Sequence, residues 1–173
     1  MSESLKPVRH RFGKLELEFR SISPADEGIL EKLFLSHSEE TVINRYFVPL
    51  RQLSLEQKRK FVSVNHVTEE AMVGYRPGVP DRLLCVGRYM ETGVPGEGEM
   101  AITVHDHYQG RGIGRFLLRL LMNRAKENGL RELTASCLAG NHAMLKLFKS
   151  QARIKSKRLE DGVYELRFDV DSL

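Results

Sequence analysis

Three glycines at alternate positions, Gly110, Gly112 and Gly114, lie at the junction where a predicted strand at residues 100–104 leads into a predicted helix at residues 112–128. The helix carries an apolar stripe on one side and basic residues on the other. Glycine lets a ligand approach the backbone closely, and the first N–H groups of a helix have no partner within it. This strand, turn and helix predict an α/β fold with an anion site suited to a diphosphate.

The common nucleotide-binding motifs do not fit this turn. A P-loop ends in Gly-Lys-Ser/Thr, whereas Gly114 is followed by Arg115 and Phe116. A dinucleotide-binding fingerprint has the spacing G-x-G-x-x-G, whereas the glycines here follow G-x-G-x-G. The turn therefore indicates a different phosphorylated ligand.

Periodicity and turn residues predict one α/β domain with a mixed sheet. Hairpins predict antiparallel pairs, and the strand–helix–strand unit around residues 112–128 predicts a parallel pair. In a chain of 173 residues we expect an N-terminal extension at 1–14 and a single domain at 15–173. Strands are predicted at 15–22, 71–75, 82–90, 100–104, 130–138, 154–159 and 163–170, and helices at 24–35, 38–47, 112–128, 141–150 and from Ser54 onward.

The composition, with 41% apolar and 29% charged residues, is that of an ordinary globular chain. Without a run of 18 apolar residues, or an apolar stretch at residues 1–10, no membrane span and no secretory signal are expected. Cys85 and Cys137 lie in apolar runs without metal or disulfide spacing, which predicts reduced cysteines in a cytoplasmic protein. His105 and His107 lack a third ligand nearby, so no metal site is expected.

The positive charge is concentrated between residues 109 and 158, where twelve Lys or Arg accompany two acidic residues. Such an excess indicates an anionic partner. The aromatic residues that alternate with basic ones in single-strand-binding proteins are missing from this segment. A phosphorylated cofactor accounts for the charge, and no nucleic-acid partner is expected.

Gln109, Gly112 and Gly114 follow a strand with the spacing Gln/Arg-x-x-Gly-x-Gly/Ala. The segment thereby resembles the acetyl-CoA-binding motif of the GNAT acetyltransferases. The segment from Asn141 to Phe148 is similar to the family's Asn-x-x-Ala/Met-x-x-Leu-Tyr/Phe segment. Within the family, the chain looks most like the acetyltransferase domains of bacterial protein-lysine acetyltransferases, through Pro24-x-Asp26 and residues 38–47.

The resemblance implies a mixed, mostly antiparallel, twisted sheet of about six to seven strands flanked by helices. It also implies acetyl-CoA as the cofactor, with guanidinium groups available for its phosphates. The residues that match the family's cofactor-binding positions, or lie beside them, are Val104, Gln109, Gly110, Arg111, Gly112, Ile113, Gly114, Arg115, Asn141 and Phe148.

Transfer to an amine needs a base, because a free lysine amine has a pKa of about 10.4. In the family this base is often a glutamate on the strand before the turn, the place that Glu99 occupies. Glu97 is the second candidate, since it shares the face of Glu99 if the strand begins there. The family stabilises the tetrahedral oxyanion with a backbone N–H near the strand end, which implies a catalytic role for Val104.

One departure from the family concerns the tyrosine that usually protonates the leaving thiolate, because Phe148 stands at that position and has no proton to give. Tyr108, His142 and Ser150 are the nearby alternatives. The departure keeps a non-catalytic acyl-CoA sensor open as a second class of function. For an enzyme, the acceptor is a primary amine, either a protein lysine or a small molecule, and a homodimer stays open.

Overall fold

The structure, a computed structural model, describes residues 6–151 and 153–171. Residues 1–5 of the expected N-terminal extension, Ala152 and the last two residues of the expected domain lie outside the described residues.

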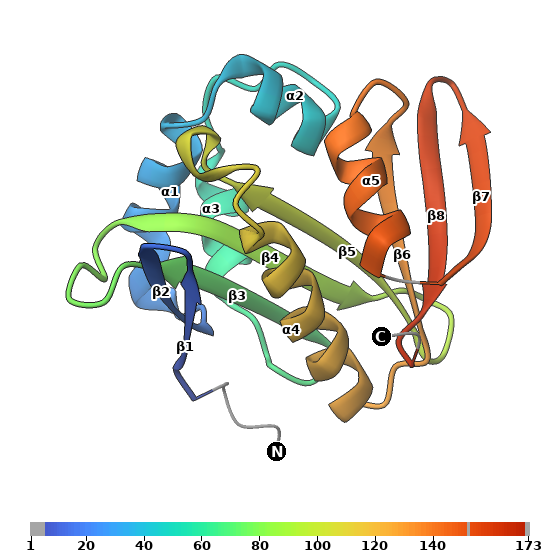
Figure 1. The fold of residues 1–173 in the computed structure, drawn as a ribbon, viewed down its shortest axis with the longest axis horizontal. Helices are drawn as coiled ribbons and strands as arrows, with labels where there is room; N and C mark the ends of the chain where they lie inside the picture. Colours follow the sequence, from blue (N-terminus) through green and yellow to red (C-terminus); the bar gives the residue numbers. More distant parts are fainter. Residues whose placement is uncertain (1–5, 152, 172–173) are drawn as a thin grey trace.

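Eight strands form one sheet in the order β1-β2-β3-β4-β5-β6-β8-β7 (Figure 1). All neighbouring pairs are antiparallel except β5 and β6, which confirms the mixed, mostly antiparallel sheet. Seven strands match the predicted ones, namely β2 (Leu15–Ser21), β3 (Glu69–Tyr75), β4 (Leu83–Glu91), β5 (Glu97–Val104), β6 (Glu132–Leu138), β7 (Ile154–Glu160) and β8 (Val163–Asp169).

The eighth strand, β1 (Val8–Phe12), exceeds the expected six to seven and lies in the segment expected to be an extension. It pairs with β2 through a tight turn in which Gly13 has a φ of 61°. Its three central residues are exposed and polar, so the strand carries no apolar alternation that sequence reasoning could detect. Phe12 at its end packs against the main core, which explains why β1 stays on the sheet.

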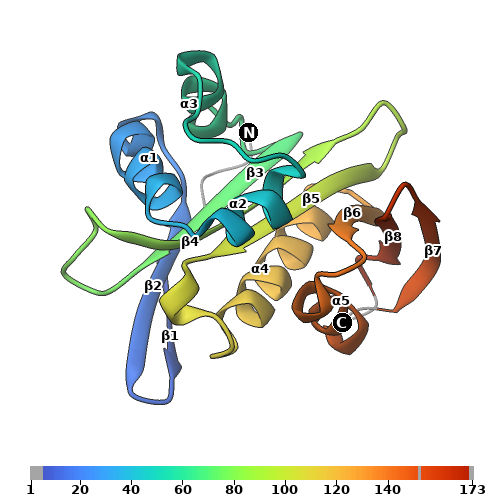
Figure 2. The same cartoon turned by 90° about the horizontal axis from the view of Figure 1, so that it is seen from above.

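The helices cover the two faces of the sheet (Figures 1 and 2). The short helices α1 (Glu27–Leu35), α2 (Glu39–Tyr46) and α3 (Leu55–Val62) lie on one face, and α4 (Ile113–Glu127) and α5 (His142–Gln151) lie on the other. Alternation along β3 supplies both cores: Ala71 and Val73 pack with α1 and α3, while Met72 packs with α4. No helix in the described ranges is long and apolar enough to span a membrane.

The parallel pair β5–β6 separates halfway along its length. Partners run only from Glu97–Glu132 to Met100–Ala135 within the described residues, although both strands continue. Beyond that point the backbone of β5 has β4 on one side only. The separation opens the sheet directly before the glycine turn.

Candidate active site

The glycine turn joins the end of β5 to the start of α4. Gly110 and Gly112 have φ values of 72° and 90°, in the left-handed region where glycine avoids the steric cost of a side chain. Gly112 is the N-cap of α4, and its carbonyl accepts the first helical hydrogen bond from the N–H of Phe116. The preceding N–H groups of this helix have no helical partner, so they are available to the anion that the sequence predicts for this turn.

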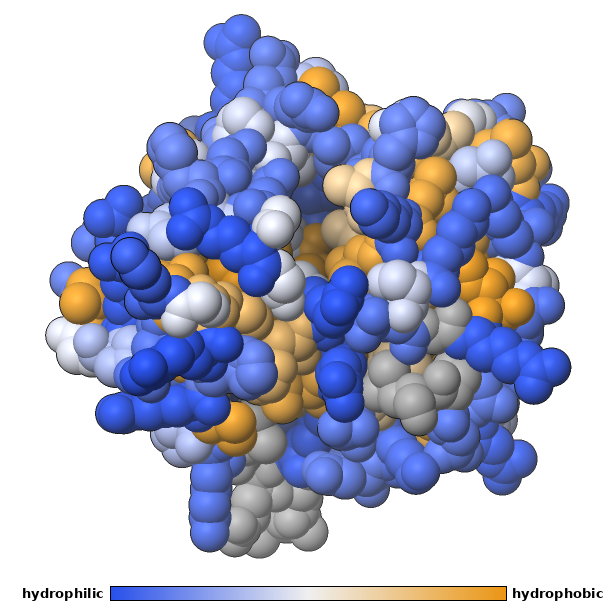
Figure 3. Space-filling view, viewed as in Figure 1, coloured by the Kyte–Doolittle hydropathy of each residue, from blue (hydrophilic) through white to orange (hydrophobic). Residues whose placement is uncertain are grey.

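A cleft of about 470 Å³ lies between this turn, the open end of β5, α2 and α5. Figure 3 shows the hollow near the centre of the face, with apolar surface exposed inside it. Its volume is in the range of small-molecule sites. Seven of the predicted cofactor residues line it: Val104, Gln109, Gly110, Gly112, Gly114, Arg115 and Asn141.

Two polar side chains fix the shape of this cleft. Gln109 Nε2 donates to the carbonyl of Val104 at 2.9 Å and to Thr41 Oγ1 at 3.2 Å, which ties the turn to β5 and α2. Asn141 Oδ1 accepts from the N–H of Met144 at 3.1 Å and caps α5, as predicted. Both residues therefore hold their elements at the rim of the cleft.

Three predicted cofactor residues do not line the cleft. Ile113 is buried in the core, so only its backbone faces the turn. Phe148 is buried as well and stacks on Phe168 with 5.4 Å between ring centroids. Arg111 is exposed and lies over the ring of Tyr108, itself a residue of the cleft wall. Phe148 thus supports α5 from inside the core.

The open end of β5 presents backbone groups to the cleft. The N–H of His105 donates to the carbonyl of Leu84 on β4 at 2.8 Å. Alternate residues of an antiparallel strand face the same neighbour, so Ile102 and Val104 direct their backbone groups away from β4, into the gap beside β6. The carbonyl of Val104 accepts from Gln109, and its N–H faces the gap.

The two candidate bases have different surroundings. Glu97 is buried, forms an ion pair with Arg167 and lies 3.2 Å from Thr92 Oγ1. Glu99 is exposed and makes no hydrogen bond or ion pair with any described residue. Burial of a carboxylate is costly unless it is paired, and Glu97 has such a partner in Arg167. The carboxylate of Glu99 is accessible instead.

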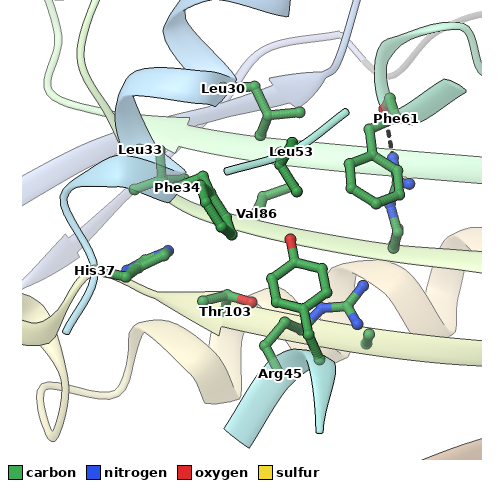
Figure 4. A pocket seen from close by; sticks show the side chains of 12 residues that line it. Leu30, Leu33, Phe34, His37, Arg45, Leu53, Phe61, Val86 and Thr103 are labelled. Carbon is green, nitrogen blue, oxygen red and sulfur yellow. Dashed lines mark hydrogen bonds between the residues drawn. The ribbon is translucent and has the colours of Figure 1, made fainter. Parts of the chain in front are cut away.

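A second cavity, the inner pocket, lies on the other face of the sheet beneath α1, α2 and α3 (Figure 4). Arg45 and Thr103 line both the inner pocket and the cleft, so the two meet across β5. Sequence reasoning missed this pocket, although Arg88 inside an apolar strand is a signal that could have revealed it. Its lining residues are Leu30, Leu33, Phe34, His37, Arg45, Tyr46, Leu53, Phe61, Val86, Arg88, Ala101 and Thr103.

Asp106 joins the inner pocket to the glycine turn. Its carboxylate accepts from the N–H of Ser38 at 3.0 Å, from Ser38 Oγ at 2.5 Å and from Thr41 Oγ1 at 2.8 Å. Burial opposes the ionised form, but these hydrogen bonds outweigh it and hold the pKa of Asp106 well below its ordinary value. The ionised carboxylate thereby anchors the start of α2 to the segment before the turn.

We expect the replacement Asp106→Asn to lower the free energy of unfolding by about 1–3 kcal/mol at neutral pH, because it removes the charge that three donors share. Since folding lowers the pKa of Asp106, its contribution is complete above the unfolded value of about 3.9 and is lost as pH falls below it. Urea unfolding of both proteins at pH 7 and pH 3 measures this. A stability difference that is as large at pH 3 as at pH 7 would contradict the role of the charge.

The fold, the open strand pair and the glycine turn define an α/β acyltransferase architecture, and the comparisons with known proteins agree. A family model described as the acetyltransferase (GNAT) family matches residues 30–152. This chain therefore belongs to the GNAT family of acetyltransferases, as its motifs predicted.

Relatives of this chain include a curated acetyltransferase of Pseudomonas aeruginosa, 26% identical over 141 residues that cover 81% of this chain and 68% of that protein. Acetyltransferase Pat of Mycolicibacterium smegmatis is 47% identical over 49 residues, 28% of this chain and 15% of that protein. The chain thus matches only a small part of Pat.

Among solved structures, the GNAT domain of S. lividans PAT superposes with a TM-score of 0.84 at 27% identity, covering 94% of this chain and 96% of that one. This match confirms the predicted likeness to the acetyltransferase domains of such proteins. The Salmonella typhimurium acetyltransferase yncA, solved with its cofactor acetyl-CoA, has a TM-score of 0.69 at 16% identity over 90% of this chain and 94% of that one, which supports the fold alone.

Proposed function

We propose that this acetyltransferase moves an acetyl group from acetyl-CoA to a primary amine, with Glu99 as the general base. The observation that carries the proposal is the cleft, in which the glycine turn, the N-terminus of α4 and the open end of β5 converge. The turn suits a diphosphate, and the cleft has room for a chain that extends from it. Membership of the GNAT acetyltransferase family supports acetyl-CoA as the donor.

The proposed reaction joins the amine nitrogen to the acetyl carbon, breaks the carbon–sulfur bond and releases a thiolate. Glu99 accepts the amine proton, directly or through a water molecule. The N–H of Val104 donates to the developing oxyanion. Tyr108 and Ser150, which line the cleft, are the candidates to protonate the thiolate in place of the family's tyrosine.

Two classes of acceptor are compatible with this chemistry. The resemblance of residues 24–26 and 38–47 to bacterial protein-lysine acetyltransferases supports a lysine side chain of a protein. A small amine is the alternative, since the inner pocket beside the cleft offers space for a small molecule. We also propose a cytoplasmic location, because Cys85 and Cys137 are buried and form no disulfide. A measurement of molecular mass in solution distinguishes a monomer from a homodimer.

Calorimetric titration with acetyl-CoA, with ATP and NAD as controls, tests the donor. We expect binding of acetyl-CoA alone, because the turn lacks the P-loop and dinucleotide patterns. A screen of amines by thiol release then tests transfer. If acetyl-CoA binds but no amine causes thiol release, the result favours the alternative function, a non-catalytic acyl-CoA sensor.

A further inference from the structure

The inner pocket contains two guanidinium groups, those of Arg45 and Arg88, and neither forms an ion pair with a described residue. The carboxylates of Glu99 and Glu69 act on Arg45 and Arg88, respectively, only as nearby charges. Arg88 donates to the carbonyl of Phe61 and lies 4.6 Å from the centroid of its ring. Arg45 makes no hydrogen bond or ion pair with any described residue and lies 4.9 Å from the ring centroid of Tyr46. Both contacts stack a charge on an aromatic face without neutralising it.

Such charges are costly in an apolar setting. Leucine and phenylalanine side chains from α1, together with Leu53, Phe61 and Val86, line the same pocket as the two arginines. Figure 4 shows Arg45 in this pocket. Burial, and then the nearby charge of Arg45, lower the pKa of Arg88 to about 10, so it stays protonated at neutral pH. Burial also lowers the pKa of Arg45, whereas the charges of Tyr46 and Glu99 act in the opposite direction. Both side chains are partly buried, and a charge withdrawn from water is normally paired.

His37 is a further polar side chain of the same pocket. Its side chain is 4% exposed, and Nδ1 has no hydrogen-bond partner among the described residues. Asp106 Oδ2 lies 3.6 Å from Nδ1, which is too far for a hydrogen bond. In Figure 4 the ring lies at the edge of the pocket, next to Phe34 and Thr103. His37 therefore adds a third polar side chain to the wall of this cavity, on the side of Asp106.

The register of the sheet brings the arginines close to the proposed base. Arg88 on β4 lies opposite Ala101 on β5, and Glu99 lies opposite Met90. Arg88 and Glu99 are therefore diagonal neighbours on one face, with roughly 7–8 Å between their backbones. A compact molecule spans that distance, with its amine toward Glu99 and an anionic group toward the arginines.

We propose that the inner pocket binds a carboxylate of the acceptor, so that the acceptor is a small amino-carboxylate, such as a free amino acid. The inference rests on the proposed function and narrows its acceptor. Two guanidinium groups match a carboxylate geometrically and electrically, whereas they repel the ammonium group of a lysine side chain. The cavity volume of about 30 Å³ admits a carboxylate but no segment of a second protein.

Turnover of matched amines tests this specificity. We compare alanine and leucine with alaninamide and leucinamide, whose amines are less basic and thus more often neutral. We expect kcat/KM to be at least about 10-fold higher for the acids, the scale of a hydrogen-bonded charge. The replacement Arg88→Met should remove this preference through a higher KM, and Arg88→Lys should restore part of it. Arg119→Met changes an exposed arginine on α4 and should leave the preference unchanged.

Ligand binding decides the inference even if no amine is turned over. We titrate N-acetylalanine and N-acetylalaninamide into the full chain in the presence of coenzyme A. Tighter binding of the acid, lost in Arg88→Met but kept in Arg119→Met, supports the pocket. Equal binding of acid and amide overturns it, whether or not acetyl transfer is found. Transfer to lysine peptides with acidic neighbours, without binding of N-acetylalanine, also overturns it while leaving the proposed reaction intact.

Discussion

Glu99→Gln is expected to slow kcat by about 10²-fold or more and to leave the affinity for acetyl-CoA unchanged. The side chain is exposed, without a partner among the described residues, so its replacement removes a base without disturbing a contact. The loss should narrow as pH rises, because more of the amine is then neutral before it binds. Steady-state thiol release at neutral and alkaline pH measures kcat, and calorimetry measures the affinity for acetyl-CoA.

Two matched variants separate this effect from structural damage. Glu97→Gln removes the buried partner of Arg167, so we expect a loss of stability with little change in kcat of the folded protein. Glu165→Gln alters an exposed carboxylate on β8 and should change neither quantity. A kcat for Glu99→Gln equal to that of the unaltered protein would remove Glu99 from the mechanism and leave the cleft assignment standing.

Gly112→Val is expected to weaken acetyl-CoA binding by about 10²-fold or more. Gly112 has a φ of 90°, a conformation in which a β-branched residue is strained by roughly 1–3 kcal/mol. An added Cβ would meet only Phe12, at 3.8 Å, so strain in the backbone rather than a clash is the damaging effect. The turn is expected to relax and take its N–H groups away from the phosphates, each such charged hydrogen bond contributing about 1.5–3 kcal/mol.

Gly129→Val provides the control for this substitution. Gly129 has a φ of 86° and follows the other end of α4, with no atom within 4 Å of an added Cβ. The two variants therefore carry similar backbone strain at opposite ends of one helix. Calorimetry at a temperature where both are folded should show lost binding in Gly112→Val alone. Equal affinities in the two variants would refute the assignment of the turn.

Local signals predicted most of the elements because each depends on residues near in sequence. Ser54 is the N-cap of α3. Its hydroxyl accepts from the N–H of Gln57 in the capping box that the sequence indicated. The glycine turn and α4 follow in the same way from backbone freedom and a 3.6-residue apolar period. Strand β1 was not predicted, because its residues are mostly exposed and its pairing depends on β2.

The order of motifs along the chain thus determined the family, the fold class and the phosphate turn, since strand, glycine spacing and capped helices are local properties. Only the tertiary structure decided that Glu97 is buried against Arg167 while Glu99 is exposed, because the partner lies on β8, seventy residues away. Only the tertiary structure likewise brought His37 from the α1–α2 connection, Arg45 from α2 and Arg88 from β4 to one pocket. Burial and charge pairing depend on neighbours that are distant in sequence, and these neighbours exist only once the sheet has formed.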